Sequence, residues 1–156
     1  MLIPRIAQEA PDAAGYIIMA GLVSPLEDIM VEQVKYLSEL DGVLIDEEKK
    51  VIASYEKMRD NVKKLDKNTS FSSQELFNVP SAYWLDLKDY NPAELAREIN
   101  KPLLILQGER DYQVPVKEFE MWKSALGAKK NVTFVLYDGL NHIMMKGEGK
   151  SNPQEY

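Results

Sequence analysis

The 156-residue sequence contains no cysteine and only one histidine. Without cysteine the chain can form no disulfide, use no thiolate nucleophile and build no cysteine-rich zinc site, and a single histidine argues against a histidine-built metal centre. We therefore expect neither a metal ion nor another cofactor. The lack of disulfides also fits the reducing environment of the cytoplasm, where we expect the protein to reside.

The sequence also lacks an excess of basic residues and any long apolar run. The 19 Lys and Arg residues are outnumbered by 25 Asp and Glu residues, which gives a net charge of −6. Proteins that bind nucleic acid or an anionic membrane favour a basic face. No run approaches the ~20 apolar residues of a membrane span, and the first residues lack the basic start and continuous apolar stretch of a signal peptide. These absences predict no nucleic-acid or membrane partner and favour a small-molecule ligand.

Three short apolar runs have the character of buried strands. Each is followed by a glycine or an Asp-Gly pair, and the runs span residues 16–20, 102–107 and 132–137. Because they show no alternation of apolar and polar residues, they predict a parallel sheet covered by helices on both faces. Phe119, Trp122 and Leu126 recur at helical spacing between the second and third runs, so a helix should connect these strands. The predicted fold class is α/β.

The segment between the first and second strands is longer than a crossover requires. Ser24-Pro25-Leu26-Glu27 has the pattern of a capping box, and an apolar stripe from Leu26 to Leu40 follows it. A second stripe runs from Val51 to Leu65 through the charged stretch 46–67. We favour a solvated helix face over a binding role for these charges. We therefore expect a helical cap at residues 24–90, inserted into a core formed by residues 1–23 and 91–156.

Asp111 and His142 each follow a predicted strand, and the two strands are consecutive. In an open parallel sheet, the carboxyl ends of the strands meet at one edge, where ligands bind. An Asp carboxylate there can bind a histidine N–H and leave the other ring nitrogen to act as a base. Taken singly, Asp111 is a turn-forming or capping acid and His142 a loop histidine that bonds backbone. Taken together, their spacing favours a catalytic pair.

The motifs Gly108-Glu-Arg-Asp111-Tyr-Gln-Val-Pro115 and Tyr137-Asp-Gly-Leu-Asn-His142 resemble the acid and histidine loops of the α/β-hydrolase fold, in the branch of serine aminopeptidase-like and dienelactone-hydrolase-like esterases. In that family the triad order along the chain is Ser, Asp, His. The resemblance covers essentially the whole chain and implies a partial α/β-hydrolase fold whose strands match the family's sixth to eighth. Residues 93–99 resemble the short helix before the seventh strand. Asp138 stands where relatives often carry proline.

The resemblance also implies what this chain does not contain. Residues 1–8 resemble the helix that follows the family's Gly-x-Ser-x-Gly elbow, so we expect the serine nucleophile and the oxyanion hole to lie outside the chain. Residues 152–156 end where relatives continue into a further helix. The serines present lack an elbow setting: Ser24 fits a helix cap, Ser124 lies in the predicted crossover helix, Ser70, Ser72 and Ser73 lie in a polar linker, and Ser81 lacks flanking glycines.

The implied function is hydrolysis of carboxylic esters or amides by a Ser-His-Asp mechanism in the intact protein, with this chain inactive alone. The alternative is a non-catalytic fragment or a binding module that uses the cap. Tyr83, Trp84 and Tyr112 are candidate substrate contacts, although packing within the cap is the simpler interpretation of Trp84. Because the family's neighbouring strand is absent, residues 16–20 should form an unpaired edge, which predicts a homo-oligomer or a strand-swapped dimer.

Overall fold

The computed structural model describes all 156 residues and divides them into two compact units. Unit 1 contains Met1–Ser24 and Asn91–Tyr156, and unit 2 contains Pro25–Tyr90. The predicted insertion of residues 24–90 therefore differs from unit 2 only at Ser24. No helix in the chain is both long and apolar enough to cross a membrane.

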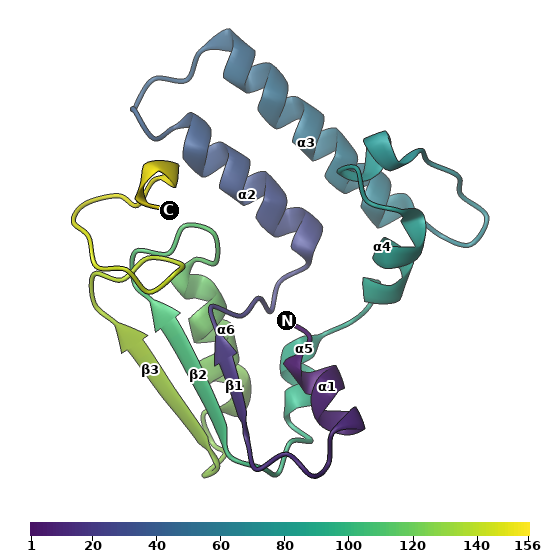
Figure 1. Cartoon of the computed structure of the whole chain (residues 1–156). Coiled ribbons are helices and arrows are strands. Elements are labelled where there is room, and N and C mark those ends of the chain that lie inside the picture. Colours follow the sequence, from purple (N-terminus) through teal and green to yellow (C-terminus); the bar gives the residue numbers. More distant parts are fainter. The chain divides into compact units, whose positions relative to one another are not determined.

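A parallel three-stranded sheet forms the centre of unit 1. Its strands are β1 (Tyr16–Met19), β2 (Leu103–Gly108) and β3 (Val132–Tyr137), arranged in the order β1-β2-β3. Leu103 lies opposite Tyr16 on one side and Val132 on the other. All three strands point to the same edge of the sheet (Figure 1). The predicted α/β class and parallel pairing are confirmed.

Helix α6 (Val116–Leu126) connects β2 to β3 and packs on one face of the sheet. Its Phe119, Trp122 and Leu126 are buried with Ile18 and Ile105 of the strands. Complete burial of a large apolar side chain contributes about 1.5–3 kcal/mol, so these three residues hold the helix firmly on the sheet. These are the three residues whose spacing predicted the helix.

The opposite face of the sheet differs from the prediction. Ile17 and Met19 point away from the α6 side and are each 57% exposed, and their neighbours Leu104 and Leu106 are only half-buried. The expectation that both faces are covered by helices is therefore wrong for this chain. The apolar character of β1 indicated burial, but local sequence does not specify which element would cover each face.

Two short helices pack against each other at the side of unit 1. Helix α1 (Ile3–Glu9) has a proline in its first turn, and α5 (Pro92–Ala96) begins after Asn91, whose side chain accepts hydrogen bonds from two backbone N–H groups. The Tyr16 hydroxyl donates to the Ala10 carbonyl at 2.7 Å, so α1 is also fixed to the start of β1. The short helix η2 (Pro153–Glu155) lies near the end of the chain.

The turn after β1 is held by α6. Ala20 adopts a positive φ of 47°, and the Trp122 indole N–H donates to the Gly21 carbonyl at 2.8 Å. The fully buried Glu118 carboxyl group accepts hydrogen bonds from the Val23 backbone N–H and from both the backbone N–H and the hydroxyl of Ser24. Ser24 is therefore not a helix cap. Helix α2 begins at Leu26 after Pro25 and has no side-chain cap, which corrects the predicted capping box.

Unit 2 is helical. It contains α2 (Leu26–Ser38), α3 (Asp46–Lys64), the short helix η1 (Ser73–Leu76) and α4 (Ser81–Leu87). Helices α2 and α3 pack side by side (Figure 1), and their partly exposed charges form the ion pairs Lys35–Glu56 and Lys63–Asp28, each at 2.6 Å. A separate apolar core lies between α3, η1 and α4; it comprises Val62, Leu65, Leu76, Phe77 and Trp84.

Candidate active site

The candidate site lies at the carboxyl edge of the unit 1 sheet. Strands β2 and β3 run in parallel and in register, with Gly108 opposite Tyr137 at their ends. Asp111 follows the end of β2, and His142 follows the end of β3. Because the two strands end side by side, their loops approach each other, as expected for ligand sites in open parallel sheets.

Glycine at position 108 permits this approach. A Cβ atom there would lie 2.4 Å from the Leu140 carbonyl oxygen and 2.7 Å from that of Asn141, distances that no real contact tolerates. The backbone N–H of Arg110 donates to the Leu140 carbonyl at 2.9 Å. The two loops are therefore in direct backbone contact, which requires a residue without a side chain at the end of β2.

Asp111 is buried and fully hydrogen-bonded. Its Oδ1 accepts from the backbone N–H groups of Gln113 and Val114, each at 2.9 Å. Its Oδ2 accepts from the Gln107 amide at 3.1 Å, and only 4% of the residue is exposed. The turn-forming interpretation of Asp111 is therefore correct, and it does not exclude a second role. These donors fix the orientation of the carboxylate.

The same oxygen of Asp111 binds the only histidine. Asp111 Oδ2 lies 2.9 Å from His142 Nδ1. Because a carboxylate only accepts hydrogen bonds, Nδ1 carries the proton and the neutral ring presents Nε2 as a base. The His142 side chain is 31% exposed, whereas that of Asp111 is fully buried. The arrangement is a buried acid that orients a ring accessible to a reactant.

The acid also changes the basicity of the ring. The hydrogen bond that His142 donates to Asp111 raises the pKa of His142 above its ordinary value, and the negative charge of Asp111 adds to this effect, while partial burial of the ring opposes it. A raised pKa means that the protonated ring is stabilised. This is the property required of a base that must hold a proton between two steps of a reaction.

The predicted substrate contacts lie in different units. Tyr112 directly follows Asp111 in unit 1, and its ring packs edge-on against Tyr156 with centroids 6.2 Å apart. Tyr83 and Trp84 belong to unit 2. Tyr83 is 40% exposed, whereas Trp84 is buried and donates its indole N–H to the Leu76 carbonyl. Packing therefore accounts for Trp84, and a substrate contact by any of the three remains a prediction.

Several serine hydroxyls are bound by carboxylates. Ser24 donates to Glu118, Ser72 to Glu75 and Ser151 to Glu155. Because each of these three hydroxyls donates its hydrogen to a carboxylate, none of them donates it to His142. No group of three or more acidic or histidine side chains is arranged to hold a metal ion.

Three residues that support the pair did not stand out in the sequence. Gln107 donates to Asp111, Asn141 is fully buried beside His142, and Arg110 is almost buried beside Asp111. Each is a polar residue within or directly beside a motif. Gln107 carries the clearest signal, because it is polar, lies in the apolar run of β2 and is 1% exposed.

The chain is similar to a protein family, to a curated protein and to solved structures. Residues 46–155 match the prolyl oligopeptidase family. The whole chain is 35% identical to Esterase EstD of Thermotoga maritima, and it spans about a third (35%) of the length of that curated relative. Two solved structures are also similar, each at 17% identity. A monoacylglycerol lipase of Paleococcus ferrophilus has a TM-score of 0.42 over 90% of this chain and 55% of its own. An alpha/beta fold family hydrolase of Bacillus anthracis has a TM-score of 0.44 over 87% and 55%.

The family match includes β2, β3 and the loops that carry Asp111 and His142. The sequence motifs, the parallel strands and this match agree on one assignment. The chain belongs to the prolyl oligopeptidase family and has a partial α/β-hydrolase fold.

Proposed function

We propose that the intact protein hydrolyses carboxylic esters or amides by a Ser-His-Asp mechanism, to which this chain contributes Asp111 and His142. The observation that carries the proposal is the 2.9 Å contact between Asp111 Oδ2 and His142 Nδ1 at the carboxyl edge of the sheet. The 35% identity to an esterase supports ester substrates. The serine nucleophile and the oxyanion hole then belong to protein outside these 156 residues.

In this mechanism His142 moves the proton and Asp111 holds the ring. His142 Nε2 takes the proton of the serine hydroxyl as the oxygen attacks the substrate carbonyl, and the protonated ring then gives that proton to the leaving alcohol or amine. Water repeats the two steps to release the acid. Asp111 keeps Nδ1 protonated and stabilises the positive ring, consistent with the raised pKa of His142. Tyr112, which directly follows Asp111, is a proposed contact with the substrate.

Turnover of a p-nitrophenyl ester by the full-length protein tests the assignment. Asp111→Asn and His142→Ala should each lower kcat/KM by about 10³-fold or more, because the base loses its orientation or is absent. Asp138→Asn is the matched control: this exposed acid lies in the same loop as His142 and should leave turnover unchanged. Wild-type turnover in Asp111→Asn or His142→Ala would refute the proposal.

A fluorophosphonate probe separates this function from the alternative of a non-catalytic module. The probe labels an activated serine. The full-length protein should be labelled, and the 156-residue chain alone should not. A full-length protein that resists the probe would favour the non-catalytic module. Labelling of the chain alone would show that one of its own serines is the nucleophile.

A further inference from the structure

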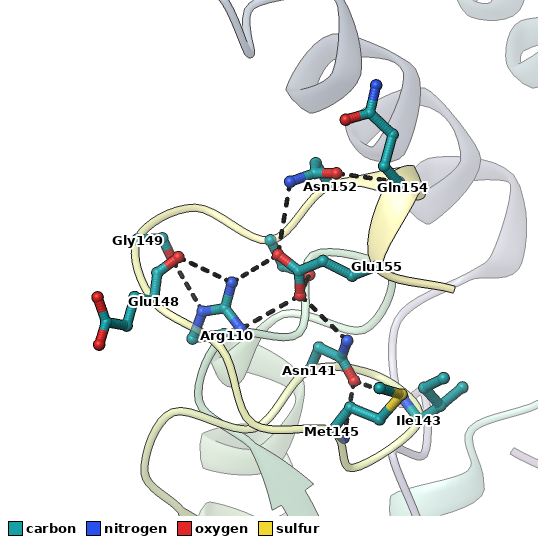
Figure 2. Close-up of polar contacts among 10 residues, drawn as sticks. Arg110, Asn141, Ile143, Met145, Glu148, Gly149, Asn152, Gln154 and Glu155 are labelled. Carbon is teal, nitrogen blue, oxygen red and sulfur yellow. Dashed lines mark hydrogen bonds and ion pairs between the residues drawn. The ribbon is translucent and has the colours of Figure 1, made fainter.

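The residues that precede Asp111 and His142 are joined by a third residue, Glu155. Arg110 Nη2 lies 2.7 Å from Glu155 Oε1, and Nη1 lies 3.2 Å from Oε2. The Asn141 amide donates to the same Oε2 at 3.2 Å. Figure 2 shows the Glu155 carboxylate between the Arg110 guanidinium and the Asn141 amide. One side chain near the end of the chain therefore bridges the loop of the acid and the loop of the histidine.

Asn141 controls the turn that carries His142. Its side-chain oxygen accepts from the backbone N–H groups of Ile143 at 3.1 Å and Met145 at 3.0 Å. Its own backbone N–H donates to the Met145 carbonyl at 2.9 Å. These bonds close a tight turn that contains His142. They also hold Met144 at a φ of +62°, a conformation that costs free energy in residues other than glycine. The Asn141 side chain is therefore a main determinant of where the ring points.

Arg110 is the other end of the bridge. Its side chain is 9% exposed, and it also donates from Nε to the Gly149 carbonyl at 2.8 Å and from Nη2 to the Glu148 carbonyl at 3.1 Å (Figure 2). Isolated surface ion pairs contribute little, but this guanidinium is almost buried and binds a carboxylate at two points. Its hydrogen bond also lowers the pKa of Glu155, with a smaller contribution from Asn141.

Gly147 provides the space for this guanidinium. A Cβ atom at position 147 would lie 2.1 Å from Arg110 Nη1. The alanine variant would therefore displace the guanidinium while leaving every charge of the chain in place. Gly147→Ala can therefore disturb the contacts of Arg110 without removing a charge.

We propose that Arg110, Glu155 and Asn141 form a positioning network that holds the His142 ring against Asp111. The proposal rests on the acid–base function proposed above for Asp111 and His142. None of the three residues is assigned a contact with the substrate. They act through the loop that carries the ring, and Glu155 transmits the position of the acid loop to the histidine loop.

The single histidine makes a direct test possible, because the NMR spectrum of the 156-residue chain contains one imidazole. Titration gives the pKa of His142, and solvent exchange of its Nδ1–H proton reports how firmly the ring is held. Arg110→Gln should lower the pKa of His142 and speed exchange on the order of tenfold, which corresponds to about 1.4 kcal/mol of lost restraint. Arg110→Lys can still contact Glu155, so the decrease in the pKa of His142 and the increase in the exchange rate should both be smaller. Gly147→Ala should act like Arg110→Gln.

The sign of the effect separates positioning from electrostatics. Removal of a nearby positive charge alone would raise the pKa of His142, whereas loss of the contact with Asp111 would lower it. Lys146→Gln is the matched control: it removes an exposed positive charge in the histidine loop without touching the network and should leave exchange unchanged. If Arg110→Gln does not fold in a thermal melt, Gly147→Ala carries the same test.

Asp111→Asn provides the reference, since it removes the ring's partner directly and should lower the pKa of His142 most. Suppose that Asp111→Asn lowers the pKa of His142, while Arg110→Gln and Gly147→Ala either leave the pKa and the exchange rate unchanged or raise the pKa. The positioning network is then refuted, and the proposed function stands. If Asp111→Asn has no effect, the pair does not form in solution, and both proposals fail.

Discussion

The Glu118 carboxyl group binds Ser24 at two points. Oε1 accepts the Ser24 hydroxyl at 2.6 Å, and Oε2 accepts the Ser24 backbone N–H at 2.7 Å. Glu118 is fully buried in the first turn of α6, and Ser24 is the last residue before the chain enters unit 2. A single buried side chain therefore fixes the position at which the chain leaves the sheet.

Glu118→Ala should destabilise unit 1 by about 2 kcal/mol or more, because the buried backbone N–H of Val23 and the half-buried N–H of Ser24 lose their acceptor. Glu118→Gln should lose less stability, since one oxygen acceptor remains. Urea unfolding measures both. Glu120→Gln, on an exposed position of the same helix, is the control and should change stability little; equal effects at positions 118 and 120 would contradict this role.

The two close-packed glycines should respond differently to alanine. At Gly108 the new Cβ would meet backbone carbonyls of the histidine loop, whereas at Gly147 it would meet the flexible end of Arg110. Gly108→Ala should therefore cost more stability, about 1–3 kcal/mol, because the loops must separate. Urea unfolding of both variants checks the order. A larger loss in Gly147→Ala would show that the loops can adjust more readily than the guanidinium.

The pair of Asp111 and His142 should make stability depend on pH with a defined sign. The pKa of His142 is raised in the folded protein. The stabilisation of the fold by the pair is therefore complete below the pKa of the unfolded chain, about 6.5, and is lost as the pH rises through the pKa of the folded protein. The difference in unfolding free energy between wild type and His142→Gln should be larger at about pH 5.5 than at about pH 9. The opposite trend would show that the ring is bound in its neutral form.

The uncovered edge at β1 should drive self-association of the isolated chain. Strand β1 is an edge of the sheet, and its Ile17 and Met19 side chains are exposed. Ile17→Lys should shift the chain toward monomer, because a charged side chain disfavours strand pairing at an edge. Sedimentation velocity measures the change. Leu136→Lys places the same charge on β3, at the other edge, and should have less effect. A wild-type chain that remains monomeric would refute the predicted assembly.

The elements of unit 1 were predictable because their signals are local. Apolar runs ended by glycine specified β2 and β3, helical spacing specified α6, and successive strand ends indicated that Asp111 and His142 would meet. Ser24 shows where local signals fail. Its sequence fits a capping box, yet its hydroxyl binds Glu118, which is 94 positions away. A buried acceptor supplied by α6 outcompetes the local cap, and no pattern near Ser24 indicates it.

The same limit applies to the support of the candidate site. Glu155 lies 45 positions from Arg110 and 14 from Asn141, and a polar segment near the end of a chain gives no local sign of such contacts. The exposed face of β1 is a related case. Its apolar residues indicated burial, but coverage depends on an element that the run itself does not specify.

The two tryptophans give the chain an internal pair of fluorescent reporters. The chain contains two. Trp122 lies in the core of unit 1 with its indole N–H on the Gly21 carbonyl, and Trp84 lies in the core of unit 2 with its indole N–H on the Leu76 carbonyl. Replacing either with phenylalanine would leave an emission spectrum that comes from one unit alone. Tryptophan fluorescence during thermal unfolding of the two variants would then show whether unit 1 and unit 2 unfold together or one after the other.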